Sequence, residues 1–328
     1  MKTLSIITAV VLFIVFISMF FYFRLFGAIG NSSQVEVFVV PQDIERLDSK
    51  IIQLLWEQKF IKNISAFKFL LDNFGDGNEI KSGGYRLTSS MNAWQVMKKV
   101  TGKPDLVWVK ISYCLRKEQI GEILAESLGW DNEKLNRWNN LYKVTKPEYF
   151  EGVYYPDTYL IPVDETESEV AQRFINRFNE KFARLSDEFV EKNIKWTTGV
   201  KIASLIAREA AGSNDMKLIS GIIWNRLDQN MALQIDATMQ YTLGKNERGG
   251  WWGSIDLEEK QSDSPYNSYK NKGLPPSAIC SPNINAIESV LDPTETECLF
   301  YLHDSARQIH CANTYQQHLQ NIEKYLRS

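Results

Sequence analysis

The sequence predicts an α+β protein with an N-terminal transmembrane helix, a small α/β unit and a larger α+β domain. Three observations indicate this fold class: an uncharged apolar run at residues 4–23, short strand and helix patterns in residues 35–146, and helical patterns separated by loops in residues 147–328. The 328 residues suffice for two domains, because a domain has about 150 residues.

The apolar run is long enough to cross a bilayer as a helix. About twenty residues span the hydrocarbon core, whereas the apolar part of a signal peptide has about 7–15. We therefore expect a short cytoplasmic tail at residues 1–3, a retained anchor at 4–23 and a linker at 24–34, with a signal cleaved near residues 28–30 as the alternative. Lys2 and Arg24 flank the run evenly, so charge does not set its orientation.

The overall charge excludes one class of partner. The chain has 37 basic and 40 acidic residues, a formal net charge of −3. A nucleic-acid-binding protein carries a basic surface, so no nucleic-acid partner is expected.

Hydrophobic periodicity predicts the elements of the first unit. In order, these are strand 35–40, helix 43–60, strand 85–87, helix 93–100, strand 107–112, and helix 117–128 with Gly129 placed to end it. Strands and helices of this length that alternate indicate a small mixed unit.

The second region is dominated by helices. Thr166 and Glu169 form a capping-box pattern that opens a helix. Further helical patterns cover residues 200–211 and 220–227, and a long loop rich in Pro, Gly, Asn and Tyr covers 262–281. A loop of this length inside a compact domain is usually functional.

Glu209 is the candidate acid. At about 100° per residue, the apolar residues three, four and seven positions earlier share its helix face. Lys201, Ser204 and Arg208 lie on a different face, which we expect to be wetted. A carboxyl group on an apolar face tends to be protonated, as a general acid must be. The alternative is a glutamate at a frayed helix end that points into water.

Amide, carboxyl and phenol groups follow Glu209 and are of the kind that hydrogen-bond and stack on sugars. The candidates are Asn225, Gln234, Asp236, Tyr266, Asn267 and Tyr269. A structural alternative exists for each, such as a turn cap for Asn225, an ion pair with Arg226 for Asp236, or packing of the loop for the tyrosines. Trp251 and Trp252 are candidates either for stacking on sugar rings or for packing their own loop.

The cysteines and histidines do not form a metal-binding pattern. Cys280, Cys298 and Cys311 lie among three histidines near the C-terminus, while Cys114 stands apart. No CxxC or HxxxH spacing is present, so no metal is expected. Either one disulfide with two free thiols or two disulfides is compatible with this set.

Several segments in order resemble the YceG-like family of endolytic murein transglycosylases. In the catalytic region they are residues 203–210, 225–227, 233–238, 264–269 and 273–276. Upstream, residues 80–99 resemble the first unit of the family, residues 107–130 its LysM-like strand–helix element, and 151–158 the start of its catalytic domain.

The resemblance implies cleavage of the β-1,4 bond between N-acetylmuramic acid and N-acetylglucosamine, without water and without a cofactor. One carboxyl group protonates the leaving oxygen and then assists attack by the C6 hydroxyl of the sugar, which leaves a 1,6-anhydro end. Glu209 is assigned both roles, and Asn225, Gln234, Asp236, Tyr266, Asn267 and Tyr269 are assigned to substrate binding.

The resemblance also implies a location and partners. These are a single-pass protein of the bacterial plasma membrane with its catalytic body on the outer side, peptidoglycan strands whose nascent length it limits, and cell-wall synthases. Two other classes stay open: a hydrolase that uses Asp236 as a second carboxylate, and a non-catalytic wall-binding anchor built on the LysM-like unit.

Overall fold

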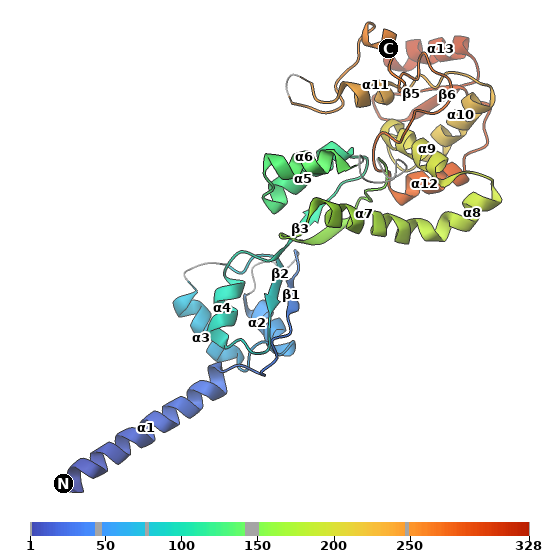
Figure 1. Ribbon diagram of the computed structural model, residues 1–328. Coiled ribbons are helices and arrows are strands. Elements are labelled where there is room, and N and C mark those ends of the chain that lie inside the picture. Colours follow the sequence, from blue (N-terminus) through green and yellow to red (C-terminus); the bar gives the residue numbers. More distant parts are fainter. Residues whose placement is uncertain (1, 43–47, 76–78, 142–150, 247–248, 328) are drawn as a thin grey trace. The chain divides into compact units, whose positions relative to one another are not determined.

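A computed structural model describes residues 2–327, apart from 43–47, 76–78, 142–150 and 247–248 (Figure 1). The chain forms two compact units, Met1–Val109 with Tyr159–Glu165, and Lys110–Thr158 with Thr166–Ser328. The predicted boundary between residues 146 and 147 lies outside the described residues.

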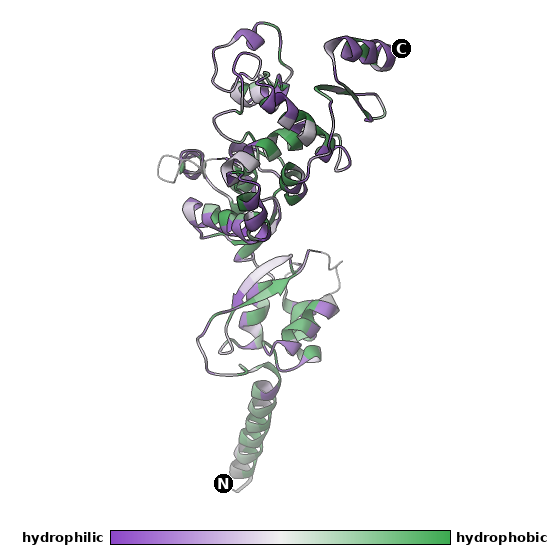
Figure 2. Cartoon of the chain, turned by 90° about the vertical axis from the view of Figure 1, so that its right-hand side faces the viewer, coloured by the Kyte–Doolittle hydropathy of each residue, from purple (hydrophilic) through white to green (hydrophobic). Residues whose placement is uncertain are grey.

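The chain begins with helix α1 (Lys2–Phe26), which contains the predicted span. Residues Ile6–Phe26 are long and apolar enough to cross a membrane, and none of this segment is buried. Figure 2 shows the hydrophobic colouring along its length.

The remainder of the first unit is built around a four-stranded sheet of order β1-β2-β3-β4. Its strands are β1 (Glu36–Val40), β2 (Gly83–Leu87), β3 (Leu106–Lys110) and β4 (Thr158–Pro162), and its helices are α2 (Asp48–Glu57), α3 (Ile64–Phe74) and α4 (Ala93–Val100). Strands β1 and β2 are antiparallel, with Glu36 opposite Leu87. Alternate residues of these strands, such as Phe38 and Tyr85, pack with the helices in one core.

The predicted elements of this unit have counterparts in the structure. Helix α4 has the predicted limits, and β1 begins one residue later than predicted. The predicted helix 43–60 is α2, and residues 43–47 of it lie outside the described residues. Helix α3 was missed, although Asn63 caps its first turn by accepting a hydrogen bond from the Ala66 amide (2.8 Å).

The second unit consists mainly of helices. They are α5 (Lys117–Leu128), α6 (Asn132–Asn139), α7 (Glu167–Phe182), α8 (Ser186–Glu191), α9 (Trp196–Glu209), α10 (Met216–Asp228), α11 (Asp236–Leu243), α12 (Ile284–Leu291) and α13 (Tyr315–Leu326). Strands β5 (Phe300–His303) and β6 (Ile309–Ala312) form an antiparallel hairpin. The predicted limits of α5, its left-handed Gly129 cap and the Thr166 capping box are all present.

Helix α9 is the central element of this unit. It packs against α8, α10, α11 and α12, and its residues 202–206 are almost completely buried. The prediction of a wetted face was wrong. Ser204 is fully buried and accepts a hydrogen bond from the Ile279 amide (3.1 Å), while the Arg208 guanidinium lies 4.1 Å from the ring centroid of Trp252.

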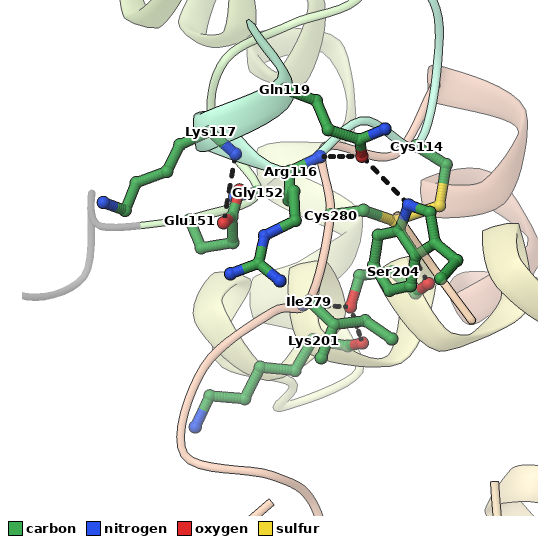
Figure 3. The surroundings of a disulfide bond; sticks show 11 residues. Cys114, Arg116, Lys117, Gln119, Glu151, Gly152, Lys201, Ser204, Ile279 and Cys280 are labelled. Atoms are coloured by element: carbon green, nitrogen blue, oxygen red, sulfur yellow. Dashed lines mark hydrogen bonds between the residues drawn. A yellow bond between two sulfur atoms is a disulfide. The ribbon is translucent and has the colours of Figure 1, made fainter. Parts of the chain in front are cut away.

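Two disulfides hold the second unit together, Cys114–Cys280 and Cys298–Cys311. Of the alternatives compatible with the sequence, the structure has the two-disulfide form, with no free cysteine among the residues described. Figure 3 shows that Cys280 lies beside Ser204 of α9. The Cys114–Cys280 disulfide therefore links the segment after β3 to the segment around Cys280, which packs on α9.

Substitution of Gly199 tests the packing of α9. A Cβ atom at this position would lie 2.2 Å from the Phe189 ring, which is itself buried. We expect Gly199→Ala to lower the free energy of unfolding by about 1–3 kcal/mol through overpacking, measured by denaturant titration. Thr198→Ala is the matched control, because it adds no atom against Phe189; equal stability of the two variants would contradict this packing.

Candidate active site

Glu209 is the last residue of α9 and lines a cavity of about 370 Å³. The cavity wall also includes Arg226, Leu233, Gln234, Tyr269, Phe300, Tyr301, Tyr315 and His318. These residues come from α10, the segment before α11, the 262–281 loop, the β5 strand and α13. The long loop and the C-terminal hairpin therefore build one pocket around the end of a buried helix.

A hydrogen bond from Tyr301 fixes the carboxyl group of Glu209. The Tyr301 hydroxyl donates to Oε2 of Glu209 over 2.6 Å. Burial raises the pKa of Glu209, the Tyr301 hydrogen bond opposes that shift, and the nearby charge of Asp236 adds to it. Burial also raises the pKa of Tyr301 well above its ordinary value, so this phenol stays a donor. Glu209 is half-buried in the cavity wall instead of extended into solvent.

The loop after Glu209 is held by Asp215. Its carboxylate accepts hydrogen bonds from the backbone amides of Ala211 (2.8 Å) and Gly212 (3.2 Å). His303 of β5 lies 2.7 Å from the same carboxylate, and its ring packs edge-to-face on Tyr301. The end of α9 and strand β5 are thereby connected through polar contacts.

Of the predicted substrate-binding residues, Gln234 and Tyr269 line the cavity with Glu209, and Asp236 contacts Tyr269 of this wall. The Tyr269 hydroxyl donates to the Asp236 carboxylate, which also pairs with Lys260 at 3.2 Å. Gln234 has a left-handed backbone conformation, with φ of 53°. Its backbone N–H donates to the Ser268 carbonyl (3.0 Å). A strained backbone at a pocket wall is common where a side chain must point at a ligand.

The other three predicted residues use their polar groups in internal hydrogen bonds. Asn225 donates to the carbonyls of Thr296 (2.7 Å) and Cys298 (3.1 Å). Asn267 is fully buried, and its amide group bridges backbone atoms of its own loop. Tyr266 shares a 2.7 Å hydrogen bond with Ser277. None of the three is among the described residues that line the cavity.

Arg226 is a buried cation of the wall that the candidate set did not include. Its guanidinium donates to the carbonyls of Leu299 (2.6 Å) and Leu233 (2.6 Å), and it lies over the Phe300 ring. Burial lowers its pKa. Arg226 therefore joins three segments of the wall.

His318 and Tyr301 were also missed. His318 stacks on Phe300, burial lowers its pKa, and its Nδ1 atom is buried without a hydrogen-bond partner among the described residues. A neutral imidazole with an unused polar atom in a cavity wall is suited to bind a ligand hydroxyl. The sequence did not indicate that either residue lies near Glu209, because they are 92 and 109 residues further along the chain (301 − 209 and 318 − 209).

Trp251 and Trp252 pack against α5. The indole of Trp251 donates to Glu122 (3.1 Å), and that of Trp252 donates to Gln119 (2.9 Å). Trp251 also lies against the Arg116 guanidinium. These contacts hold the loop of the two tryptophans against α5, and neither tryptophan is among the described residues that line the Glu209 cavity.

The structure offers no candidate metal centre in the part of the chain that it describes. No group of three or more His, Cys, Asp or Glu side chains there could hold an ion. All four cysteines lie in the disulfides.

The sequence model of the YceG-like family matches residues 43–324. The chain belongs to the YceG-like family. This membership confirms the resemblance drawn from residues 203–276 and their upstream segments.

Two relatives of this YceG-like chain carry the name endolytic murein transglycosylase. The protein of Streptococcus pneumoniae is 25% identical over 283 residues, which cover 76% of this chain and 51% of the relative. That of Bacillus subtilis is 24% identical over 302 residues, covering 85% and 82%. The chain thus spans about half the length of its pneumococcal relative.

A crystal structure of a yceG-like protein from Listeria monocytogenes has the same fold. It superposes with a TM-score of 0.56 at 24% sequence identity, over 88% of this chain and 99% of that chain. This likeness supports the mixed α+β architecture.

Removal of the Cys298–Cys311 disulfide tests how the wall is held. This disulfide links β6 to the segment before β5, and Cys311 lies opposite Tyr301 in the hairpin register. We expect the double substitution Cys298→Ser, Cys311→Ser to lower the free energy of unfolding by about 2–4 kcal/mol and to speed amide hydrogen exchange in residues 300–312. The serine pair is preferable to a reductant, because a reductant would also cut Cys114–Cys280. Unchanged exchange in the hairpin would rule out the clamping role.

Proposed function

We propose that this protein is a peptidoglycan lytic endotransglycosylase with Glu209 as its catalytic acid and base. The observation that carries the proposal is the desolvated Glu209 carboxyl, held by Tyr301 in a polar cavity. The names of the relatives supply the substrate class.

The hydrogen bond from Tyr301 gives the two carboxyl oxygens of Glu209 different roles. Oε2 accepts the Tyr301 hydrogen bond, which leaves Oε1 to carry the acidic proton. Burial raises the pKa of Glu209, so a larger share of the molecules holds this proton near neutral pH. A carboxyl group of this kind can protonate a glycosidic oxygen.

The reaction balances with one carboxyl group. Glu209 gives its proton to the bridging oxygen, and the bond from that oxygen to C1 of the muramic acid breaks. The C6 hydroxyl of the same sugar then attacks C1 and returns its proton to the Glu209 carboxylate. Because the nucleophile belongs to the substrate, the ring closure is intramolecular and gains from proximity. The product carries a 1,6-anhydro end, and the enzyme regains its starting protonation state.

The alternative of a hydrolase requires Asp236 as a free second carboxylate. Asp236 accepts the Tyr269 hydroxyl and pairs with Lys260. These contacts favour a role in holding Tyr269 at the cavity over a role as base or nucleophile. Gln234, Asp236, Tyr269 and His318 are the residues that we assign to the sugar, and Asn225, Tyr266 and Asn267 position the wall and the loop.

The proposal includes a location. The exposed apolar helix α1 supports a single-pass anchor in the bacterial plasma membrane, with the catalytic unit on the outer side. The chain order strand–helix–helix–strand from β3 to β4 is compatible with a LysM-like unit that binds glycan. Control of nascent strand length and contact with cell-wall synthases complete the proposed role.

Substitution of Glu209 tests the acid. A glutamine side chain at this position keeps the shape and can accept the Tyr301 hydrogen bond, but it has no acidic proton. We expect Glu209→Gln to reduce the yield of 1,6-anhydro ends from purified sacculi at least ~100-fold with an unchanged Tm. Glu191→Gln, on the exposed surface of α8, is the matched control. Wild-type yield from Glu209→Gln would refute the assignment.

Mass spectrometry of the same digests separates the reaction classes. A hydrolase leaves reducing ends that are one water heavier than anhydro ends. Binding of sacculi without any change in strand length would instead support the wall-binding anchor.

Substitution of Tyr301 tests the link between the two side chains. The Tyr301 hydrogen bond lowers the pKa of Glu209, so its loss raises that pKa. We expect Tyr301→Phe to reduce kcat/KM about tenfold and to move the alkaline limb of the pH profile to higher pH, since Glu209 then keeps its proton longer. Tyr315→Phe, in the same wall but without a contact to Glu209 among those described, should leave the limb in place. A limb that moves to lower pH would contradict the mechanism.

A further inference from the structure

A second cavity of about 230 Å³ lies along the first turns of α9. Its wall consists of Glu151, Trp196, Thr197, Val200, Lys201, Pro276, Ser277 and Ala278. None of the described residues in this wall lines the cavity at Glu209. The volume is below the usual range for drug-sized ligands and suits a small group.

Lys201 supplies an unpaired cation to this cavity. Its ammonium has no hydrogen-bond or ion-pair partner among the described residues, and Figure 3 shows only its backbone carbonyl in a hydrogen bond, with Ser204. The side chain is half-buried, and burial lowers its pKa. A partly desolvated ammonium without a partner is suited to bind an anionic ligand group.

Glu151 supplies a buried carboxyl group to the same cavity. Its side chain is almost completely buried, and its three hydrogen bonds are all long, at 3.3 Å, from the amides of Lys117 and Gly152 and from the Tyr241 hydroxyl. Burial and the charge of Glu118 raise its pKa to about 8. Its partners among the described residues are therefore neutral groups, and no cation pairs with it there.

The cations beside Glu151 are already engaged elsewhere. The Arg116 guanidinium pairs with Glu118 at 2.6 Å and donates to the Tyr241 carbonyl at 2.7 Å. The Lys117 ammonium pairs with Glu118 at 3.3 Å and donates to the Asn139 carbonyl at 2.6 Å. Glu151 and Lys201 form no ion pair with each other among the described contacts. The cavity wall thus contains a buried carboxyl group and an ammonium group, and neither forms an ion pair among the described contacts.

We propose that this cavity binds an amino-acid head group, with its ammonium at Glu151 and its carboxylate at Lys201. Trp196, Val200 and Pro276 would cover the carbon chain, and the hydroxyls of Thr197 and Ser277 give further hydrogen bonds. The ligand class rests on the proposed function, because the stem peptides of peptidoglycan carry free carboxylates and, at diamino acids, free amines. The site therefore recognises the peptide of the strand, while the Glu209 cavity holds its sugars.

Binding of meso-diaminopimelate to the full chain in detergent micelles tests the site by calorimetry. The matched probes are its N-acetylated form, which lacks the ammonium groups, and its diamide, which lacks the carboxylates. We expect the wild type to bind the zwitterion at least tenfold more tightly than either derivative. Absence of binding, or equal binding of the three, overturns the proposal.

Variants locate the binding. Lys201→Met should weaken binding of meso-diaminopimelate at least tenfold, while Lys195→Met, at an exposed lysine just before α9, should not. Glu151→Gln should weaken binding of the zwitterion but not of the N-acetylated form. Because Glu151 is buried, Lys201→Met serves as the test that does not depend on folding of the Glu151 variant. Unchanged affinity in Lys201→Met overturns the proposal.

A second measurement separates this site from the proposed reaction. Glu209→Gln should bind meso-diaminopimelate like the wild type, even though its yield of anhydro ends is strongly reduced. On active protein, we expect Lys201→Met to lose a preference for strands with stem peptides over strands from which the peptides were removed. If the wild type forms no anhydro ends at all, the reaction proposal fails and the binding result still decides the site. An unaltered preference in Lys201→Met refutes the recognition of peptide.

Discussion

The burial of α9 is the constraint on which the site depends. Neighbouring helices cover this helix on nearly every side, and an internal glycine lets Phe189 approach its backbone. The C-terminal end of the helix meets the cavity that Glu209 lines. A carboxyl group fixed to a rigid, dry helix cannot turn freely to water, so its raised pKa follows from where the helix ends.

The rest of the site is assembled from segments that are distant in sequence. The β5–β6 hairpin brings Tyr301 to Glu209, Arg226 joins the hairpin to the segment before α11, and Asn225 holds the chain that enters the hairpin. Several of these contacts are hydrogen bonds to backbone carbonyls, which hold the position of a segment independently of its side chains. The pocket is thus a product of long-range contacts around one local element.

Local signals predicted the elements well, and long-range contacts explain what they missed. Helices α4 and α5 have the predicted limits because capping residues and apolar spacing are properties of a short segment. The apolar helix face that ends at Glu209 could also be predicted, because it depends on residue spacing within one short segment. The prediction of a solvent-exposed face on α9 was wrong because Arg208 packs on Trp252, and helical periodicity cannot reveal a partner so distant in sequence. Tyr301 lies on a four-residue strand, which is too short to show a clear alternation of apolar and polar residues. Asn225 was predicted to bind sugar, but its side chain donates to a backbone carbonyl of the protein.

The two disulfides make the second unit dependent on the redox state of its surroundings. Such bonds persist where the medium is oxidising and are kept reduced in the cytosol. A chain retained on the reducing side would lack both covalent ties, including the one that closes the hairpin opposite Tyr301. With the proposed location outside the membrane, both disulfides form only after export, so the cavity proposed to be catalytic takes its final form in the compartment of the proposed substrate.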